Sequence, residues 1–183
     1  KGGNKGEMTV KFGAEVGFQS VAKTIDVLNG KQYMETLNAL RLESNNPEGA
    51  IYTAEQIAAV GKGTNWQDEI FRVSAPVQNY QLSISGGSDK HDYYLGLSYF
   101  DQQGVVKLSS LKKYNVRANM NFTPKTFLRF KFNMNYTRTD GKSTYENMTG
   151  ANEAAGPINS ALQFDPTLAP GIDPETGRYR KNS

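Results

Sequence analysis

The chain has 183 residues, a formal net charge of +3 and no cysteine. That length allows one or two domains, the lack of cysteine excludes disulfides and thiolate sites, and the small, scattered charge does not indicate a nucleic-acid partner. Hydrophobic residues make up only 37% of the chain, yet it holds ten Tyr and nine Phe. This mixture indicates neither an ordinary compact globule nor a disordered chain, and no run of about 18 apolar residues is present for a membrane-spanning helix.

The first structured segment is a predicted strand over residues 8–18. Successive side chains leave a strand on opposite sides, so a period of two in hydrophobicity indicates extended backbone. The start of the chain is rich in Lys and Gly and shows no signal peptide, so we interpret it as an internal start. The apolar residues of the alternation are Met8, Val10, Phe12, Ala14, Val16 and Phe18.

The segment 20–76 loses this alternation and has a helical pattern. Apolar residues at helical spacing predict a helix over residues 31–42, which the turn-forming residues 45–49 end. This face carries Tyr33, Leu37 and Leu40.

Two further helices are predicted in the same segment. Thr53 and Gln56 have the spacing of a capping box for a helix that runs through Val60 and ends at Gly61. Residues 65–72 predict another short helical turn.

Alternation resumes after residue 76 and predicts four more strands. A turn at residues 86–90 joins strands around residues 80–85 and 93–99. The clearest pattern follows, with two arms of about ten residues, near the length that a tilted strand needs to cross a bilayer. We place their turn at residues 123–126. One face of the two arms carries Tyr114, Val116, Ala118, Met120, Phe122, Leu128, Phe130, Phe132, Met134 and Tyr136, and the other carries Asn, Arg, Lys and Thr.

This order predicts an all-β fold, a fragment of an antiparallel transmembrane β-barrel with a helix-containing extracellular loop. One apolar face that ends in aromatic rings, opposite a polar face, is typical of such barrels. Five strands do not close a barrel, because single-chain barrels begin at about eight strands and an open edge in lipid leaves backbone groups unpaired. We therefore expect a piece of something larger or one protomer of a shared barrel. The alternative is a soluble sheet with these aromatic residues in its core.

Loop lengths predict an orientation for the strands. Barrels of the outer membrane have short periplasmic turns and longer extracellular loops, so the turns at 88–92 and 123–126 are expected in the periplasm. The connections 20–76, 101–111 and 141–183 then lie outside the cell, and the assignments alternate correctly along the chain. Residues 141–183 form a long loop or tail rich in Gly, Pro, Asn and Ser, with one short helix at 157–164.

Several segments together resemble the SusC/RagA family of TonB-dependent outer-membrane transporters of Bacteroidetes. The resemblance extends in the family's order to about residue 140 and would place the chain in the N-terminal part of the barrel. The matching segments are 25–29 (IDVLN) with Tyr33, 65–72 (NWQDEIFR), 79–90 (NYQLSISGGSDK), 93–95 (YYL), 98–107 (SYFDQQGVVK) and 113–119 (KYNVRAN).

The resemblance implies a barrel of about 22 strands with an N-terminal plug. Residues 1–7 would end the linker from the plug, and residues 8–140 would hold the first barrel strands. The family imports glycans or peptides across the cell outer membrane, usually with a SusD-like surface lipoprotein and with energy from TonB. The TonB box and plug are absent from this chain, so such partners would act through other parts of the protein.

Candidate contact residues are few. Arg117, Arg129 and Lys131 could line the lumen and attract anionic groups of a substrate, although any barrel has a polar lumen wall. Trp66 and Tyr52 could stack on sugar rings, although large aromatic residues also pack the interior of a loop.

No residue is expected to act in catalysis, to bind a cofactor or to ligate a metal. His91 lies among the turn-forming residues of a hairpin, and Asp173 to Gly177 lack the spacing of a calcium loop. We therefore predict that the chain is no enzyme. Besides import, two functions remain open, namely a structural or adhesive outer-membrane barrel and a soluble carbohydrate-binding β-domain.

Overall fold

The computed structural model describes residues 6–44, 49–143, 156–173 and 177, which fall into two compact units. The first unit, Lys1–Ser20 with Arg72–Glu146, holds a β-sheet, and the second, Val21–Phe71 with Asn147–Ser183, holds helices. The start of the predicted linker, the helix-ending residues 45–48 and part of the predicted tail lie outside the described residues.

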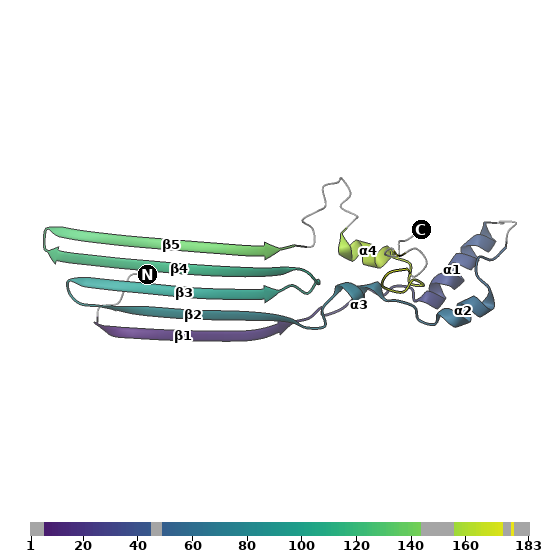
Figure 1. Ribbon diagram of the computed structural model, residues 1–183, viewed down its shortest axis with the longest axis horizontal. Helices are drawn as coiled ribbons and strands as arrows, with labels where there is room; N and C mark the ends of the chain where they lie inside the picture. The colour runs from purple at the N-terminus through teal and green to yellow at the C-terminus, as the bar shows by residue number, and fades with distance from the viewer. Residues whose placement is uncertain (1–5, 45–48, 144–155, 174–176, 178–183) are drawn as a thin grey trace. The chain divides into compact units, whose positions relative to one another are not determined.

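The sheet has five antiparallel strands in the order of the chain, β1-β2-β3-β4-β5 (Figure 1). Each strand pairs with its sequence neighbour, which confirms the predicted all-β, antiparallel class. The strands are β1 Gly6–Gln19, β2 Ala75–Gly87, β3 His91–Gln103, β4 Ser110–Lys125 and β5 Leu128–Lys142.

The register keeps the apolar residues of all five strands on one face. Because side chains alternate along each strand, a pairing with no slip between strands adds the five apolar stripes into one surface. One row across the sheet consists of Phe12, Leu82, Leu97, Val116 and Tyr136, and the adjacent row on the opposite face consists of Gly13, Gln81, Ser98, Asn115 and Thr137.

The apolar face of the sheet is largely uncovered. Phe12 and Phe18 have 71% and 73% of their surface exposed, and Phe130 has 55% exposed. Among the described residues, the buried hydrophobic side chains are only Met34, Ala75 and Ala161. The sheet therefore has two outward surfaces of opposite polarity rather than a core of its own.

The predicted turn at residues 123–126 was wrong. Lys125 pairs with Leu128, so the chain reverses at Thr126 and Phe127. Thr123 donates its backbone N–H to the carbonyl of Lys90 at 2.7 Å and extends the ladder to β3. Pro124 has no N–H to donate, and the irregular register between Phe122 and Lys125 lets the strand accommodate it.

The strands are also longer than predicted. β4 has 16 residues and β5 has 15, and the connection between β3 and β4 covers only residues 104–109. The apolar alternation stops before the hydrogen-bond ladder does, because polar residues take over the apolar face at the strand ends.

In its described residues the second unit contains four short helices, all at predicted positions. α3 packs against α4, and α1 packs against α2. Among the described residues, none of the helices is long and apolar enough to cross a membrane. The helices are α1 Gly30–Glu43, α2 Ala54–Val60, α3 Trp66–Ile70 and α4 Pro157–Gln163.

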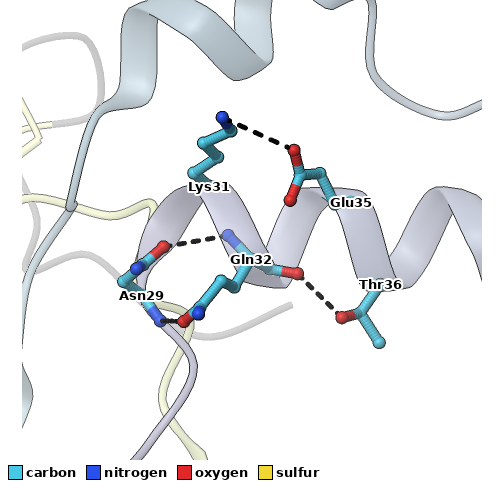
Figure 2. A network of polar contacts seen from close by, with 5 residues as sticks. All are labelled: Asn29, Lys31, Gln32, Glu35 and Thr36. Carbon is cyan, nitrogen blue, oxygen red and sulfur yellow. Dashed lines mark hydrogen bonds and ion pairs between the residues drawn. The ribbon is translucent and has the colours of Figure 1, made fainter.

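The N-terminus of α1 is fixed by a capping box (Figure 2). The Asn29 side chain accepts from the Gln32 N–H at 2.9 Å, and the Gln32 side chain accepts from the Asn29 N–H at 3.1 Å. Both bonds satisfy N–H groups that a helix start leaves unpaired. Thr53 and Gln56 form the second capping box at α2, as predicted.

Two polar side chains fasten the irregular parts of this unit. Buried Gln67 accepts from the Ile25 N–H at 3.0 Å and donates to the Ile25 carbonyl at 2.7 Å. Asn38 accepts from the Tyr52 N–H at 2.9 Å and donates to the Tyr52 carbonyl at 2.8 Å. The two side-chain amides thus satisfy the backbone N–H and carbonyl groups of Ile25 and Tyr52, which no backbone ladder pairs.

Candidate functional site: the two faces of the sheet and the loop groove

The centre of the polar face holds a concavity of about 410 Å³ around Arg117. Arg117 lies on β4 between Gly96 of β3 and Asn135 of β5. Amide and hydroxyl groups surround it in a hydrogen-bonded series. Asn115 Nδ2 donates to Ser98 Oγ at 2.9 Å, and Thr137 Oγ1 donates to Asn115 Oδ1 at 2.8 Å. The other lining residues include Gln81, Ser83 and Tyr94.

The other two predicted cations lie nearer the turn between β4 and β5. Lys131 pairs with Asn121, whose Nδ2 donates to Asp92 Oδ1 at 2.8 Å. Arg129 lies two residues before Lys131 and therefore on the same side of β5. The structure thus places the three cations on the polar face but brings only Arg117 into the concavity, and their substrate role stays a prediction.

A tyrosine row crosses the apolar face near one end of the strands. The ring centroids of Tyr80 and Tyr99 are 6.4 Å apart, and those of Tyr99 and Tyr114 are 5.1 Å apart. Tyrosine has an apolar ring and a polar hydroxyl, which suits the boundary between hydrocarbon and water.

Charged residues continue this row and follow directly beyond it, and sequence reasoning missed them. Arg138 of β5 pairs with Tyr114, whereas Lys112, Asp101 and Asp140 lie one row further out. Lys112 Nζ lies 3.5 Å from Asp101 Oδ2, and Arg138 Nε lies 3.1 Å from Asp140 Oδ2. The four charged side chains lie on the same face of their strands as the apolar residues. The sequence signal that could have found them is therefore an alternation that continues with charged residues in place of apolar ones. Such a change marks the place where this face leaves an apolar environment.

Aromatic rings also lie at the opposite end of the apolar face. The centroids of Phe122 and Phe130 are 6.4 Å apart. Eight residues separate Tyr114 from Phe122 on β4, roughly 26 Å at about 3.3 Å per residue. With a tilt of about 40° the height is roughly 20 Å, comparable to the apolar band of about 25 Å on membrane barrels.

The helical unit contains an open groove of about 550 Å³. Trp66, Phe164 and Tyr33 line it. The Trp66 ring lies 4.6 Å from that of Phe164 with an edge-on geometry, and Trp66 Nε1 donates to the Asp165 carbonyl at 2.9 Å. Burial raises the pKa of the Tyr33 hydroxyl, and the nearby Asp165 carboxylate raises it further.

These contacts join segments far apart in the sequence and give Trp66 a packing role. Tyr52, which is held through its backbone by Asn38, is not among the residues that line the groove. The structure therefore does not bring Trp66 and Tyr52 together in one groove. Contact of either side chain with a sugar stays a prediction.

His91 is the first residue of β3, directly after the turn that follows β2. Its Nδ1 lies 2.9 Å from Ser88 Oγ, and Ser88 also accepts the Lys90 N–H. Within the described part of the chain, no group of three or more His, Cys, Asp or Glu residues is arranged to hold a metal ion.

No family model matches the chain, but curated proteins of one kind are similar to it over its whole length. The TonB-dependent receptor SusC of Bacteroides thetaiotaomicron is 33% identical, and the TonB-dependent receptor P3 of Formosa agariphila is 31% identical. Each match covers 100% of this chain and 17% of the relative, so the chain spans about a sixth of their length.

Solved structures show the same fold. The RagAB peptide importer in its open-open state superposes with a TM-score of 0.71 at 19% identity, over 93% of this chain and 21% of the other. The closed-closed state gives a TM-score of 0.66 over 98% of this chain and 22% of the other. The sheet and helices thus match a segment of a much longer barrel chain.

Proposed function

Because the chain belongs to the SusC/RagA family of TonB-dependent receptors, we propose that it forms barrel wall and outer loops of an importer in the outer membrane. The transported molecules would be glycans or peptides. In this role the chain performs no covalent chemistry. Its sheet separates lipid from a water-filled lumen.

The two-faced sheet carries this proposal. A tyrosine row and a phenylalanine pair bound the apolar face, and the polar face holds the amide and hydroxyl series around Arg117. A soluble carbohydrate-binding sheet would need other residues to cover Phe12 and Phe18, which are mostly exposed. Lipid covers such a face without further protein.

The partners of the whole protein are part of the same proposal. A SusD-like surface lipoprotein would bind at the outer loops, and TonB would supply energy through segments other than this chain. The support is the SusC name of one relative and the two-component RagAB structures among the fold neighbours.

Energised uptake distinguishes import from a structural or adhesive barrel. We expect that deleting the gene of the full-length receptor abolishes uptake of its glycan or peptide substrate, and that a protonophore does the same in wild-type cells. An adhesive barrel predicts loss of surface binding with uptake unchanged. Uptake that persists in the deletion strain would contradict the proposal.

The absence of cysteine from the chain permits a direct test of orientation. We propose that the helical unit is extracellular and that the turn after β2 is periplasmic. In a full-length receptor whose other cysteines are replaced, K62C should react with a 5-kDa polyethylene-glycol maleimide in intact cells. K90C should react only after the outer membrane is permeabilised.

Both positions are solvent-exposed lysines, so their intrinsic access to the reagent is matched. Labelling is read as a mass shift on a denaturing gel. Reaction of K90C in intact cells, with K62C protected, would reverse the orientation.

A further inference from the structure

The surroundings of Arg117 are chemically uniform. The residues that flank it across the strands are Gly96 and Asn135, and those that flank it along β4 on the same face are Asn115 and Asn119. All are uncharged. Among the described residues the structure records no ion pair for Arg117, and its guanidinium is the single charged group among the residues that line the concavity.

The neighbour of Arg117 on β3 is a glycine, Gly96, which also lines the concavity. Tyr94 Oη lies 2.8 Å from the position that a Cβ would occupy at Gly96, so the phenol folds over the glycine. Its hydroxyl adds another polar group to the lining of the 410 Å³ concavity. This volume is within the range of about 300–1,000 Å³ that small-ligand sites occupy.

The groups in this concavity fit a ligand with many hydroxyls and a carboxylate. Amides and hydroxyls such as those of Asn115, Asn135 and Thr137 both donate and accept, as sugar hydroxyls do. A guanidinium binds a carboxylate through two parallel N–H···O bonds. A peptide would need apolar pockets for its side chains, whereas the residues that line this concavity are mostly polar, with Leu82 and Leu97 as the apolar exceptions.

We propose that the concavity around Arg117 is a binding site for acidic oligosaccharides, with Arg117 contacting a sugar carboxylate. The site rests on the proposed import function and narrows its substrate class. Arg117 would act by binding and not by chemistry, and the surrounding amides would hold the hydroxyls of the same sugar ring.

Uptake of two matched sugars by cells that carry the full-length receptor tests this site. The probes are fluorescently labelled galacturonic acid hexamer and the neutral galactose hexamer of equal length. We expect R117Q to lower uptake of the acidic hexamer about fivefold, the size expected for one charge-assisted contact in a solvated site. Uptake of the neutral hexamer should change less than about twofold.

Two variants control for charge and geometry. K113Q removes one positive charge from the same face of β4, outside the concavity, and it should leave acidic uptake unchanged. R117K keeps the charge but loses the planar guanidinium that can bind a carboxylate through two N–H groups. Uptake of the acidic hexamer by R117K should therefore lie between the uptake by the wild type and that by R117Q.

Three results would overturn the site. The first is wild-type uptake of the acidic hexamer by R117Q, the second is an equal loss of both hexamers in R117Q, and the third is an equal loss of acidic uptake in K113Q. Failure of wild-type cells to import the acidic hexamer would also overturn it. Cells that lack the receptor could take up both hexamers normally and still fail to take up the receptor's own substrate. That result would contradict the proposed site but leave the proposed import function intact.

Discussion

Replacing Leu97 by Arg is expected to destabilise the folded barrel by about 2–4 kcal/mol, the cost of a cation in the middle of a lipid-facing surface. Leu97 lies at the centre of the apolar face, in the row with Leu82 and Val116. The long side chain cannot reach water from this depth without distorting the bilayer. Reversible urea unfolding of the full-length receptor in lipid vesicles measures the change.

Ser98→Arg is the matched control for this prediction. Ser98 is the next residue of β3 and points to the opposite face, where the lumen is expected to be wet. The same side chain should cost less than about 1 kcal/mol there. Equal losses at both positions would show that the apolar face does not contact lipid and would favour the soluble-sheet alternative.

Replacing Gly63 by Ala is expected to destabilise the helical unit by about 3 kcal/mol. Gly63 has a φ of 64°, which costs other residues about 1–2 kcal/mol. A Cβ there would also collide with the carbonyl oxygen of Pro166, a clash of backbone against side chain worth about 1–3 kcal/mol. That carbonyl accepts the Thr64 N–H at 2.8 Å. If Pro166 moved away to avoid the new methyl group, this hydrogen bond between distant segments would break.

Gly49→Ala separates the strain of a positive φ from the collision. Gly49 has a φ of 72°, but no atom lies within 4 Å of the position of its missing Cβ. Hydrogen exchange of the full-length receptor, followed in peptides from residues 54–71, should show a larger loss of protection in G63A than in G49A. Equal exchange in the two variants would show that Pro166 does not pack against Gly63.

Local sequence signals were sufficient to predict the helices and strands of this chain. The capping box of Thr53 and Gln56 was predicted, because it joins residues three apart, whereas the box of Asn29 and Gln32 has the same spacing and was not predicted. Strand alternation is equally local. The turn at Thr126 was missed because Pro124 usually marks a turn, whereas here the ladder from Thr123 to Lys90 keeps that residue in a strand.

The candidate site was predictable only in part. The alternation of β4 and β5 placed Arg117, Arg129 and Lys131 on the polar face. That Arg117 alone enters the concavity depends on Gly96 and Tyr94 of β3, which meet it only through the register between β3 and β4. The ion pair between Lys112 of β4 and Asp101 of β3 likewise depends on the register between two strands, whereas Arg138 and Asp140 are neighbours within β5.

The sequence by itself determined the five strands, the four helices and the polarity of each strand face, because these follow from periods and caps within a few residues. The tertiary structure decided which rows align across the sheet and which distant segments share the helical unit. Trp66 reaches the Asp165 carbonyl across 99 residues, and Thr64 reaches the Leu168 carbonyl across 104. Such contacts depend on complementary packing after the chain has folded, and no local period encodes them.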